Sequence, residues 1–507
     1  MGDFSDDEVP NVKRQRVGEL NSEDTDDEDL PDYLKQQIPG PTTKKHEEFF
    51  LDTIDKEMLD FDTEKLCSVS LANFNVYCCL VCGKFLQGRS RSSYAYEHAV
   101  EENHRPFMNL ETKKAYILPD NVELTSPKAT NILSTIREAL SPEYTPEKVE
   151  ELLQLPKTGF DLHHMRYTVG FIGLNNISAN DYANVVIQAL AHIAPIMKFY
   201  LSLSFEQNKE LQEKVSRHST LNAQFSLLLR KLWSDRLFRS HISPREILQL
   251  ISSLSKKRFS IDVQSSPKDF MIWLLNHLYI QISKVVGPKN VLSQSLQGKV
   301  EVTTIPILTK TNEKLNKVDF TIENARSTRN ISNFWLLTLS IYPTSLSKSD
   351  SERDNNTNQI PELSILDLLA KYDGQNKVQG SATDLKSYKL VNPLPPYLIF
   401  HIDRELSSDL IRNRQVVVKF PRVIDMAPYV KNPFNQPLNY RIISNIRHQL
   451  VPGNELDRSD DKHQWSISIC KNANKNEWLQ IKDLEVKECE EELMFLNENY
   501  IQIWQRC

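Results

Sequence analysis

The sequence has little cysteine, and the few cysteines are unevenly spread. Seven occur in 507 residues, and none lies between Cys82 and Cys470. Thiol chemistry is therefore excluded from most of the chain. There is also no run of about 18 apolar residues, so we expect no membrane-spanning helix. The first residues are polar and acidic, which does not fit a secretory signal peptide.

An excess of basic charge is missing as well. The formal net charge is −6, but residues 1–35 alone hold 12 acids and 4 bases, a net charge of −8. The other 472 residues therefore sum to about +2, which predicts no broad basic face for nucleic acid. Residues 1–45 have few apolar side chains and are predicted to be a disordered acidic tail.

Two short features of this tail suggest transport or regulation. Lys13-Arg14-Gln15-Arg16 is a basic patch of the kind found in nuclear-import signals, although short patches are common. Ser22 and Thr25 lie among acidic residues, where phosphorylation would add further negative charge.

The cysteines that are present cluster near the N-terminus in a pattern typical of a metal site. Cys79 and Cys82 are separated by two residues, His98 follows after 15 more, and His104 after another five. This spacing predicts a closed tetrahedral site for one structural zinc ion. Coordination would supply stability that a core of about 60 residues lacks. Cys78 and Cys67 are weaker alternative ligands.

This unit resembles the ubiquitin-protease-type zinc finger in its one-zinc form. Ubiquitin-binding members of that family hold a free C-terminal Gly-Gly in a pocket lined by aromatic residues and an arginine. Here tryptophan is absent before Trp233. The resemblance therefore implies a structural or protein-docking role for the finger.

The chain is expected to divide into four parts. After the tail, residues 46–125 should hold a helix with apolar spacing and then the finger. Residues 126–160 should be a helical connector, because Pro127 and Pro146 follow good N-cap residues. From 161 to 507, helices should come before strands. The expected helices are 182–215, 220–236, 244–257 and 267–284, the expected strands are 333–342, 396–403, 415–420, 438–446 and 465–471, and a surface loop is expected at 343–362.

The segment from Gly173 to Gln188 resembles the nucleophile segment of ubiquitin-specific proteases. The matching positions are Gly173, Leu174, Asn176, Tyr182, Asn184 and Gln188. This alignment places Asp181 where the family has its cysteine. An ionised carboxylate in water does not replace a thiolate in attack on an amide. The resemblance therefore implies a protease scaffold that binds without cutting.

The other catalytic positions are also changed. The base position precedes an aromatic residue that opens a strand, so Trp465 puts Gln464 there; a shift of one residue would put His463 there instead. The orienting position falls on Lys482. Asn176 keeps the position of the oxyanion donor. One retained member of four does not make a catalyst.

Further matches extend the resemblance over about 340 residues. They include a Leu-Pro-Pro strand at 394–404 and a strand at 440–448. The implied fold is α+β, a papain-like ubiquitin-specific-protease domain with a helical thumb and a β-rich palm and fingers. Its cysteine pairs for a fingers zinc are missing, so no second zinc is expected.

Other roles stay open for some of these residues. Asp181 at a helix start would also serve as an N-cap, and His401 and His448 fit ordinary strand positions. A residual hydrolase using Asp181, His463 or Cys470 is a third hypothesis that nothing in the spacing favours, since Cys470 lies on a late strand without a paired base.

The whole combination resembles the inactive ubiquitin-protease homologues of the splicing machinery. That resemblance implies a nuclear, non-catalytic scaffold that promotes assembly or maintenance of the spliceosomal tri-snRNP by docking to snRNP proteins. The alternative is a ubiquitin or ubiquitin-like binding protein without protease activity. Direct contact with RNA is left open.

Overall fold

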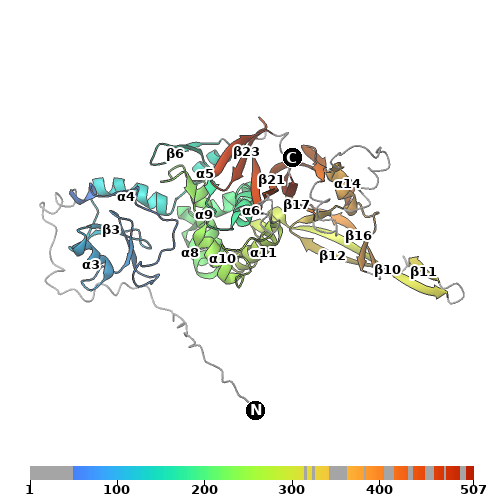
Figure 1. Cartoon of the computed structure of the whole chain (residues 1–507), viewed down its shortest axis with the longest axis horizontal. Helices are drawn as coiled ribbons and strands as arrows, with labels where there is room; N and C mark the ends of the chain where they lie inside the picture. Colours follow the sequence, from blue (N-terminus) through green and yellow to red (C-terminus); the bar gives the residue numbers. More distant parts are fainter. Residues whose placement is uncertain are drawn as a thin grey trace, which may run out of the picture. The chain divides into compact units, whose positions relative to one another are not determined.

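The computed structural model of the chain describes residues 49–507 except for 155, 313–316, 323–325, 342–361, 382–383, 405–415, 432–437, 452–461, 473–474 and 491–497. The predicted tail 1–45 and nearly all of the predicted loop 343–362 lie outside the described residues. The chain divides into two compact units (Figure 1). Unit 1 holds the described residues up to Ile54 and Cys67–Thr130, and unit 2 holds Asp55–Leu66 and Asn131–Cys507.

Unit 1 is a small antiparallel sheet with one helix. Its strand order is β2-β1-β3-β4-β5, and the elements are β1 Val76–Cys79, β2 Phe85–Gln87, α3 Tyr94–Glu101, β3 Pro106–Asn109, β4 Ala115–Ile117 and β5 Val122–Glu123. Its core includes Tyr77, Phe107 and Ala95, so helix and sheet share one small apolar centre. The core is too small to stabilise such a unit without further cross-links.

The helix predicted within 46–64 is wrong for most of the described part. Only residues around 49–51 are helical, and the chain then continues through turns. The Asp55 carboxylate accepts the N–H of Glu57, and the Asp60 carboxylate accepts the N–H of Asp62, both over 2.9 Å. These local bonds compete with helical bonds and override the apolar spacing.

The segment Asp55–Leu66 is held to the rest of unit 2 by an ion pair with a buried lysine. Lys231 Nζ donates to Asp62 Oδ1 over 2.7 Å and to the Phe61 carbonyl over 2.9 Å, and the Lys231 side chain is only 6% exposed. The second oxygen of Asp62 accepts the N–H of Ser243 over 3.0 Å. A part of the sequence that precedes the finger is therefore bound to the larger unit.

The helices of unit 2 cluster before its main sheets in the sequence. They are α4 Pro127–Leu140, in which the unit boundary falls, α5 Pro146–Gln154, α6 Asp181–Ala191, α7 Ala194–Ser202, α8 Lys209–His218, α9 Thr220–Leu232, α10 Arg245–Leu254, α11 Pro267–Val286 and α12 Val291–Leu296. Both α4 and α5 begin at the prolines expected as first helical residues.

The single helix predicted at 182–215 is wrong. It breaks at His192, because Pro195 has no N–H to donate and clashes with the preceding turn.

An eight-stranded palm sheet forms the centre of unit 2. Its main order is β13-β17-β25-β21-β22-β23-β24, with β19 (Val423–Asp425) paired to β21. The bounds are β13 Leu337–Ser340, β17 Tyr397–Asp403, β21 Asn439–Val451, β22 Lys462–Asn472, β23 Glu477–Lys482, β24 Glu485–Cys489 and β25 Glu498–Arg506. Helix α6 packs against β22, and all of its side chains are buried. The expected order of helices and strands in an α+β fold is confirmed.

A second, six-stranded sheet forms the fingers. Its order is β11-β10-β16-β15, with β12 and β20 paired to β10 and β16. The bounds are β10 Gly298–Asn312, β11 Lys317–Ile322, β12 Thr328–Phe334, β15 Val378–Ser381, β16 Asp384–Val391 and β20 Val430–Lys431. The strand predicted at 333–342 is therefore divided between β12 in the fingers and β13 in the palm. Short elements complete the unit: β6 Thr158–Phe160, β7 Arg166–Thr168, β8 Gly173–Leu174, β9 His241–Ile242, β14 Glu362–Ser364, α14 Ile365–Leu369 and β18 Val417–Lys419.

No single helix in the described part of the chain is long and apolar enough to cross a membrane. The pair α6 and α7 meets that test only when joined, and it is bent by 88°.

Candidate functional site

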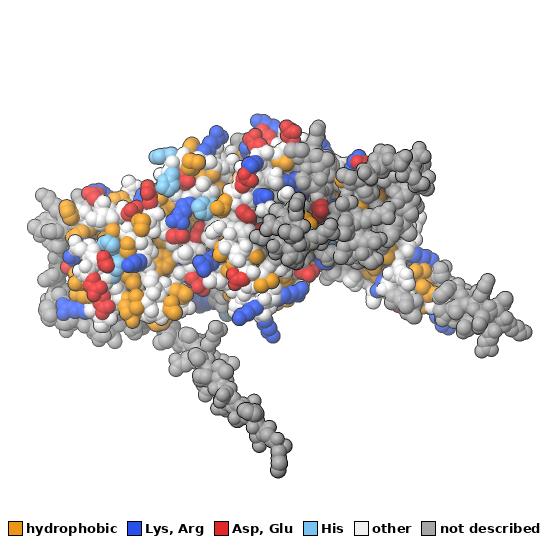
Figure 2. All heavy atoms as spheres, in the orientation of Figure 1, with side chains coloured by type: hydrophobic (Ala, Val, Ile, Leu, Met, Phe, Trp, Pro, Cys, Tyr) orange, Lys and Arg blue, Asp and Glu red, His pale blue; other side chains and the backbone are white. Residues whose placement is uncertain are grey.

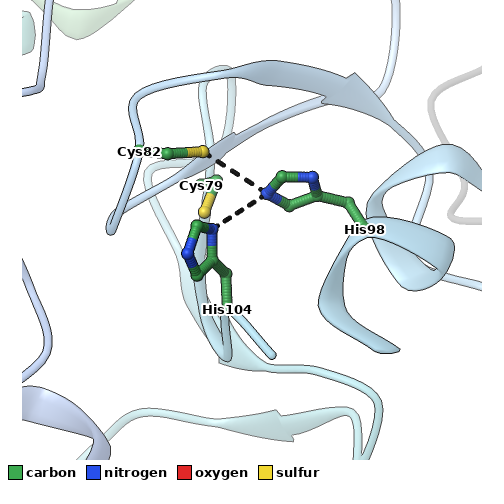
Figure 3. A group of neighbouring side chains, drawn as sticks. All are labelled: Cys79, Cys82, His98 and His104. Atoms are coloured by element: carbon green, nitrogen blue, oxygen red, sulfur yellow. Dashed lines mark hydrogen bonds between the residues drawn. The ribbon is translucent and has the colours of Figure 1, made fainter. Parts of the chain in front are cut away.

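The predicted zinc ligands come from one end of the small sheet and from its helix. Cys79 ends β1, and Cys82 lies in the turn before β2. The N–H of Gly83, at a φ of 74°, donates to the Cys79 carbonyl over 2.9 Å and closes this turn. His98 lies in α3, and His104 follows the end of that helix. Figure 3 shows the four side chains converging from these elements.

The distances within this cluster fit one tetrahedral ion. Cys82 Sγ lies 3.3 Å from His98 Nε2, which lies 3.1 Å from His104 Nδ1 (Figure 3). The four ligand atoms all lie within 4.8 Å of one another. Ligand atoms about 2.0–2.3 Å from a tetrahedral zinc are separated by roughly 3.3–3.8 Å. Two sulfur and two nitrogen donors are also the set that zinc prefers.

The chemistry of the thiols supports a cation at this place. Burial raises the pKa of the Cys79 thiol to about 12, so a bound cation is what would favour the thiolate there. The weaker candidates lie outside the cluster. Cys78 Sγ is 3.5 Å from the Cys79 carbonyl oxygen, and Cys67 Sγ accepts the N–H of Ser70 over 3.4 Å.

In unit 2, three amides on one face of α6 and its N-terminal turn hold the segment before the helix. Asn180 and Asn184 each donate to the Asn175 carbonyl, over 3.1 and 3.2 Å. Gln188 donates to the Ile172 carbonyl over 2.7 Å. The spacing of four residues places these amides on one side of the helix. The Asn and Gln positions of the protease-like motif are therefore used to hold the scaffold together.

Asp181 is almost completely buried and links three parts of unit 2. It is 3% exposed. Its Oδ1 accepts the N–H of Tyr182 over 2.9 Å and Nε2 of Gln264 over 2.8 Å. Its Oδ2 accepts the N–H of Trp465 in β22 over 3.1 Å. The carboxylate thus joins the start of α6 to the segment before α11 and to the palm sheet.

The prediction that Asp181 is the N-cap of its helix is wrong. Asn180 occupies that position, without a side-chain bond to the first turn, and Asp181 is the first helical residue. Besides the N–H of the adjacent Tyr182, its carboxylate accepts bonds from Gln264 and Trp465, which are distant in the sequence.

These bonds occupy the part of β22 that β23 does not reach. The β22–β23 pairing extends only to Ile467, paired with Ile481. Beyond it, the Trp465 N–H is bound by Asp181 and the His463 carbonyl accepts Nε2 of Gln264 over 3.2 Å. Two side chains therefore satisfy backbone groups that an added extended chain would otherwise pair with.

The predicted oxyanion donor is engaged as well. Asn176 Nδ2 donates to Asp483 Oδ2 over 3.4 Å, and its Oδ1 accepts the N–H of Asn180 over 3.1 Å. Burial raises the pKa of the Asp483 carboxyl, and the negative charge of Asp181 adds to this rise. The turn at Asp483 also lies so close to Gly173 that a side chain there would meet backbone atoms 2.5–2.9 Å away. Lys482, the predicted orienter position, is half-buried on β23.

The histidines near the base position form a chain of their own. His448 Nδ1 is 2.6 Å from Glu498 Oε2, and its Nε2 is 2.8 Å from His463 Nδ1. His463 is exposed, while Gln464 is half-buried. His448 lies in strand β21, as expected of an ordinary strand residue, and Glu498 is its carboxylate partner. His401 is 2% exposed, and burial lowers its pKa to about 3, so it stays neutral.

Two thiols of unit 2, those of Cys470 and Cys489, lie on the face of the palm sheet away from α6. Cys470 on β22 and Cys489 on β24 are both cross-strand partners of Trp478. They pack against the second core cluster, whereas α6 belongs to the first. Cys507 is exposed at the last residue.

Sequence reasoning missed Gln264 and Glu498. Gln264 lies 83 residues from Asp181, and Glu498 lies 50 residues from His448, so neither pair leaves a local signal. A motif search reads residues close in sequence, while both contacts depend on the closed fold.

Comparison with known proteins adds to this geometry. The profile of the family described as "Ubiquitin carboxyl-terminal hydrolase" matches residues 172–504, and that of "Zn-finger in ubiquitin-hydrolases and other protein" matches residues 67–129. The finger match and the Cys/His cluster together indicate zinc binding.

Similar proteins span nearly the whole chain. "Probable mRNA-splicing protein ubp10" of Schizosaccharomyces pombe is 35% identical, over 99% of this chain and 96% of its own length. "Pre-mRNA-splicing factor SAD1" of Saccharomyces cerevisiae is 30% identical, over 98% and 99%. A solved structure described as an essential yeast splicing factor matches with a TM-score of 0.69 and 28% identity, covering 90% of this chain and all of that one.

Proposed function

The chain belongs to the ubiquitin carboxyl-terminal hydrolase family, and from this premise we propose that it is a non-catalytic docking protein of pre-mRNA splicing. Its role would be to promote assembly or maintenance of the spliceosomal tri-snRNP in the nucleus. The relatives that match it over nearly their full length are named as splicing proteins, and this supports the proposal.

The observation that carries the absence of catalysis is the environment of Asp181. Attack on an amide or thioester needs a nucleophile with an adjacent base. Here a carboxylate is buried and already accepts bonds from Tyr182, Gln264 and Trp465. We assign Gln464 to the base position and Lys482 to the orienter position, and neither group accepts a proton at neutral pH.

The same bonds argue against passage of an extended chain between α6 and β22. A tail entering there would have to displace Asp181 from Trp465 and Gln264 from His463. Displacing Asp181 would leave a buried carboxylate without these donors, at a cost of about 1–3 kcal/mol. Asn176, which we assign to the oxyanion-donor position, already donates its amide N–H to Asp483.

We assign one structural zinc ion to Cys79, Cys82, His98 and His104. We place these ligands in the helix-plus-finger part at 46–125, from which the segment Asp55–Leu66 is excluded because it belongs to unit 2. The ion would stabilise a unit with a small core and keep no open position for water. Residues 126–160 would connect it to the protease-like domain at 161–507. Both units would act as docking surfaces for snRNP proteins.

Protein rather than RNA is the proposed partner class. On the face shown in Figure 2, acidic and basic side chains of the described residues are interspersed. Phosphate binding needs a concentrated basic surface, and the chain apart from residues 1–35 carries a net charge of only about +2.

Two experiments test this proposal. Nuclear extract depleted of the chain should lose tri-snRNP on a glycerol gradient and regain it on addition of purified protein. Ubiquitin carrying a C-terminal propargylamide should form no adduct with the protein. The proposal would be contradicted if the added protein did not restore the tri-snRNP peak. It would also be contradicted by a ubiquitin adduct that disappears when a cysteine is replaced.

Ubiquitin or ubiquitin-like binding is the second candidate. It is favoured by the family match and by the presence of both the helices and the fingers sheet of the fold in unit 2. Titration of ¹⁵N-labelled ubiquitin tests it. Chemical-shift changes at micromolar to millimolar protein would support this function, and their absence would remove it.

A further inference from the structure

Strand β12 forms an open border of the fingers sheet. Among the described residues it pairs only with β10, from Thr328↔Thr304 to Phe334↔Gly298 (Figure 1). Its first six residues are all exposed, and Ile331 is 62% exposed. Within the described part of the chain, the strand therefore has one unpaired edge as well as two largely open faces.

This border has little protection against pairing. Natural edge strands carry charged side chains, proline or a bulge, or they are very short, and Arg329 is the one charged residue of β12. The sequence of β12 is Thr-Arg-Asn-Ile-Ser-Asn-Phe, and its register with β10 contains no shift. At one end the Phe334 ring covers Gly298, where an added Cβ would meet it at 2.2 Å, so this contact fixes the register.

The exposed charge along this border is basic. Arg329 on β12 and Lys299 on β10 are exposed, and by register they lie on the same face as Ile331. Glu301, the acid of that face, is bound to Lys431 over 2.6 Å. An extended segment paired to β12 would therefore meet positive charge and one apolar side chain.

We propose that β12 is a docking edge that accepts an extended acidic segment of a partner protein as an added β-strand. This deepens the proposed docking function and rests on it, because it names the kind of segment that would be held. Backbone N–H and C=O groups alternate along a strand edge, and a peptide backbone matches that alternation, whereas an RNA phosphate backbone has no donors to pair with.

The register predicts the side chains of the occupant. Directly opposite residues of paired strands interact. The occupant should carry a β-branched residue opposite Ile331 and an acid opposite Arg329. Because Arg329 and Ile331 lie on one face of β12, acids and β-branched residues should alternate at every second position, along one face of the occupant.

A fluorescent peptide with glutamate and valine in turn at every second position, and threonine between them, tests this on the full-length protein. A control peptide has the same composition with all glutamates first, so net charge is equal. Fluorescence polarisation should show binding of the alternating peptide at least about tenfold tighter than the control, the equivalent of one or two hydrogen bonds. Hydrogen exchange should slow at residues 328–334.

A pair of proline variants separates docking from folding. Successive residues of a strand point their N–H groups to opposite edges, so Asn330→Pro and Ile331→Pro affect different edges. The variant that loses the N–H facing β10 should melt at a lower temperature. The other should keep its melting temperature and bind the peptide at least about tenfold more weakly. Arg329→Glu should weaken binding and regain it with a peptide carrying lysine at the opposing position.

Equal binding of both peptides, no binding up to millimolar concentration, or unchanged binding by the proline variant that melts normally would overturn the docking edge. Tighter binding of single-stranded oligouridine than of the alternating peptide would overturn it as well. Restoration of tri-snRNP in depleted extract by wild-type protein, together with any of these results, would leave the proposed function standing.

Discussion

Replacing Asp181 by alanine should destabilise unit 2 although it removes no apolar contact. The side chain is 3% exposed and accepts long-range bonds from Gln264 and Trp465. Hydrogen bonds to charged groups contribute about 1.5–3 kcal/mol each, and removal of the carboxylate also ends its own burial cost. We expect a net loss of about 3 kcal/mol in the free energy of unfolding.

The size of unit 2 converts this loss into a small thermal shift. With roughly 390 residues, its unfolding entropy is on the order of 0.8 kcal/mol per kelvin, so the melting temperature should fall by about 4 °C. The melting temperature of Asp181→Asn should lie between those of wild type and Asp181→Ala, because asparagine keeps one acceptor oxygen but turns its NH₂ group towards a donor.

Urea unfolding followed by circular dichroism measures the loss, and hydrogen exchange at the Trp465 amide reports it locally. That amide should exchange faster in Asp181→Ala. Asp262→Ala is the matched control, since this exposed aspartate belongs to the same segment as Gln264, and its effect should stay within about 0.5 kcal/mol. If Asp181→Ala is as stable as the control and the Trp465 exchange rate is unchanged, the carboxylate does not link these elements.

Three further outcomes are expected. Cys82→Ser, or chelation of zinc, should unfold unit 1, and proton-induced X-ray emission should then find no metal; a finger that melts normally without zinc would refute the assignment. Lys231→Met should lower the free energy of unfolding by about 3 kcal/mol, because it leaves the partly buried Asp62 carboxylate without its cation, and adding Asp62→Leu should recover part of this loss; additive losses in the double-mutant cycle would count against the pair. Burial lowers the pKa of His192 to about 4 and of His401 to about 3, from 6.5. The unfolded chain thus binds more protons, and stability should fall as pH drops from about 6.5 towards 4; His401→Leu should flatten this slope in thermal melts.

The parts of the site that the sequence predicts are those made by nearby residues. Cys79 and His104 are separated by a short stretch, so their spacing alone predicts a shared ion. The prolines at 127 and 146 start helices because their fixed backbone suits the first turn. The position of α6 follows from its Asn and Gln residues, which bond the segment before it.

The parts that the sequence does not predict depend on the closed fold or on competing local bonds. Asp181 looks like an N-cap until β22 brings the Trp465 N–H within 3.1 Å. The apolar spacing after residue 49 favours a helix, but Asp55 and Asp60 bind nearby backbone groups instead. The pairing of Asp62 with Lys231 joins residues 169 positions apart, which no local pattern encodes.

Removal of every thiol from unit 2 tests the central claim most directly. Unit 2 contains Cys470, Cys489 and Cys507, and the zinc ligands lie in unit 1. The triple serine variant, checked by its melting temperature for correct folding, should restore tri-snRNP and splicing in depleted nuclear extract as fully as wild type. A variant that folds normally and yet fails to restore them would contradict a docking role that needs no sulfur chemistry.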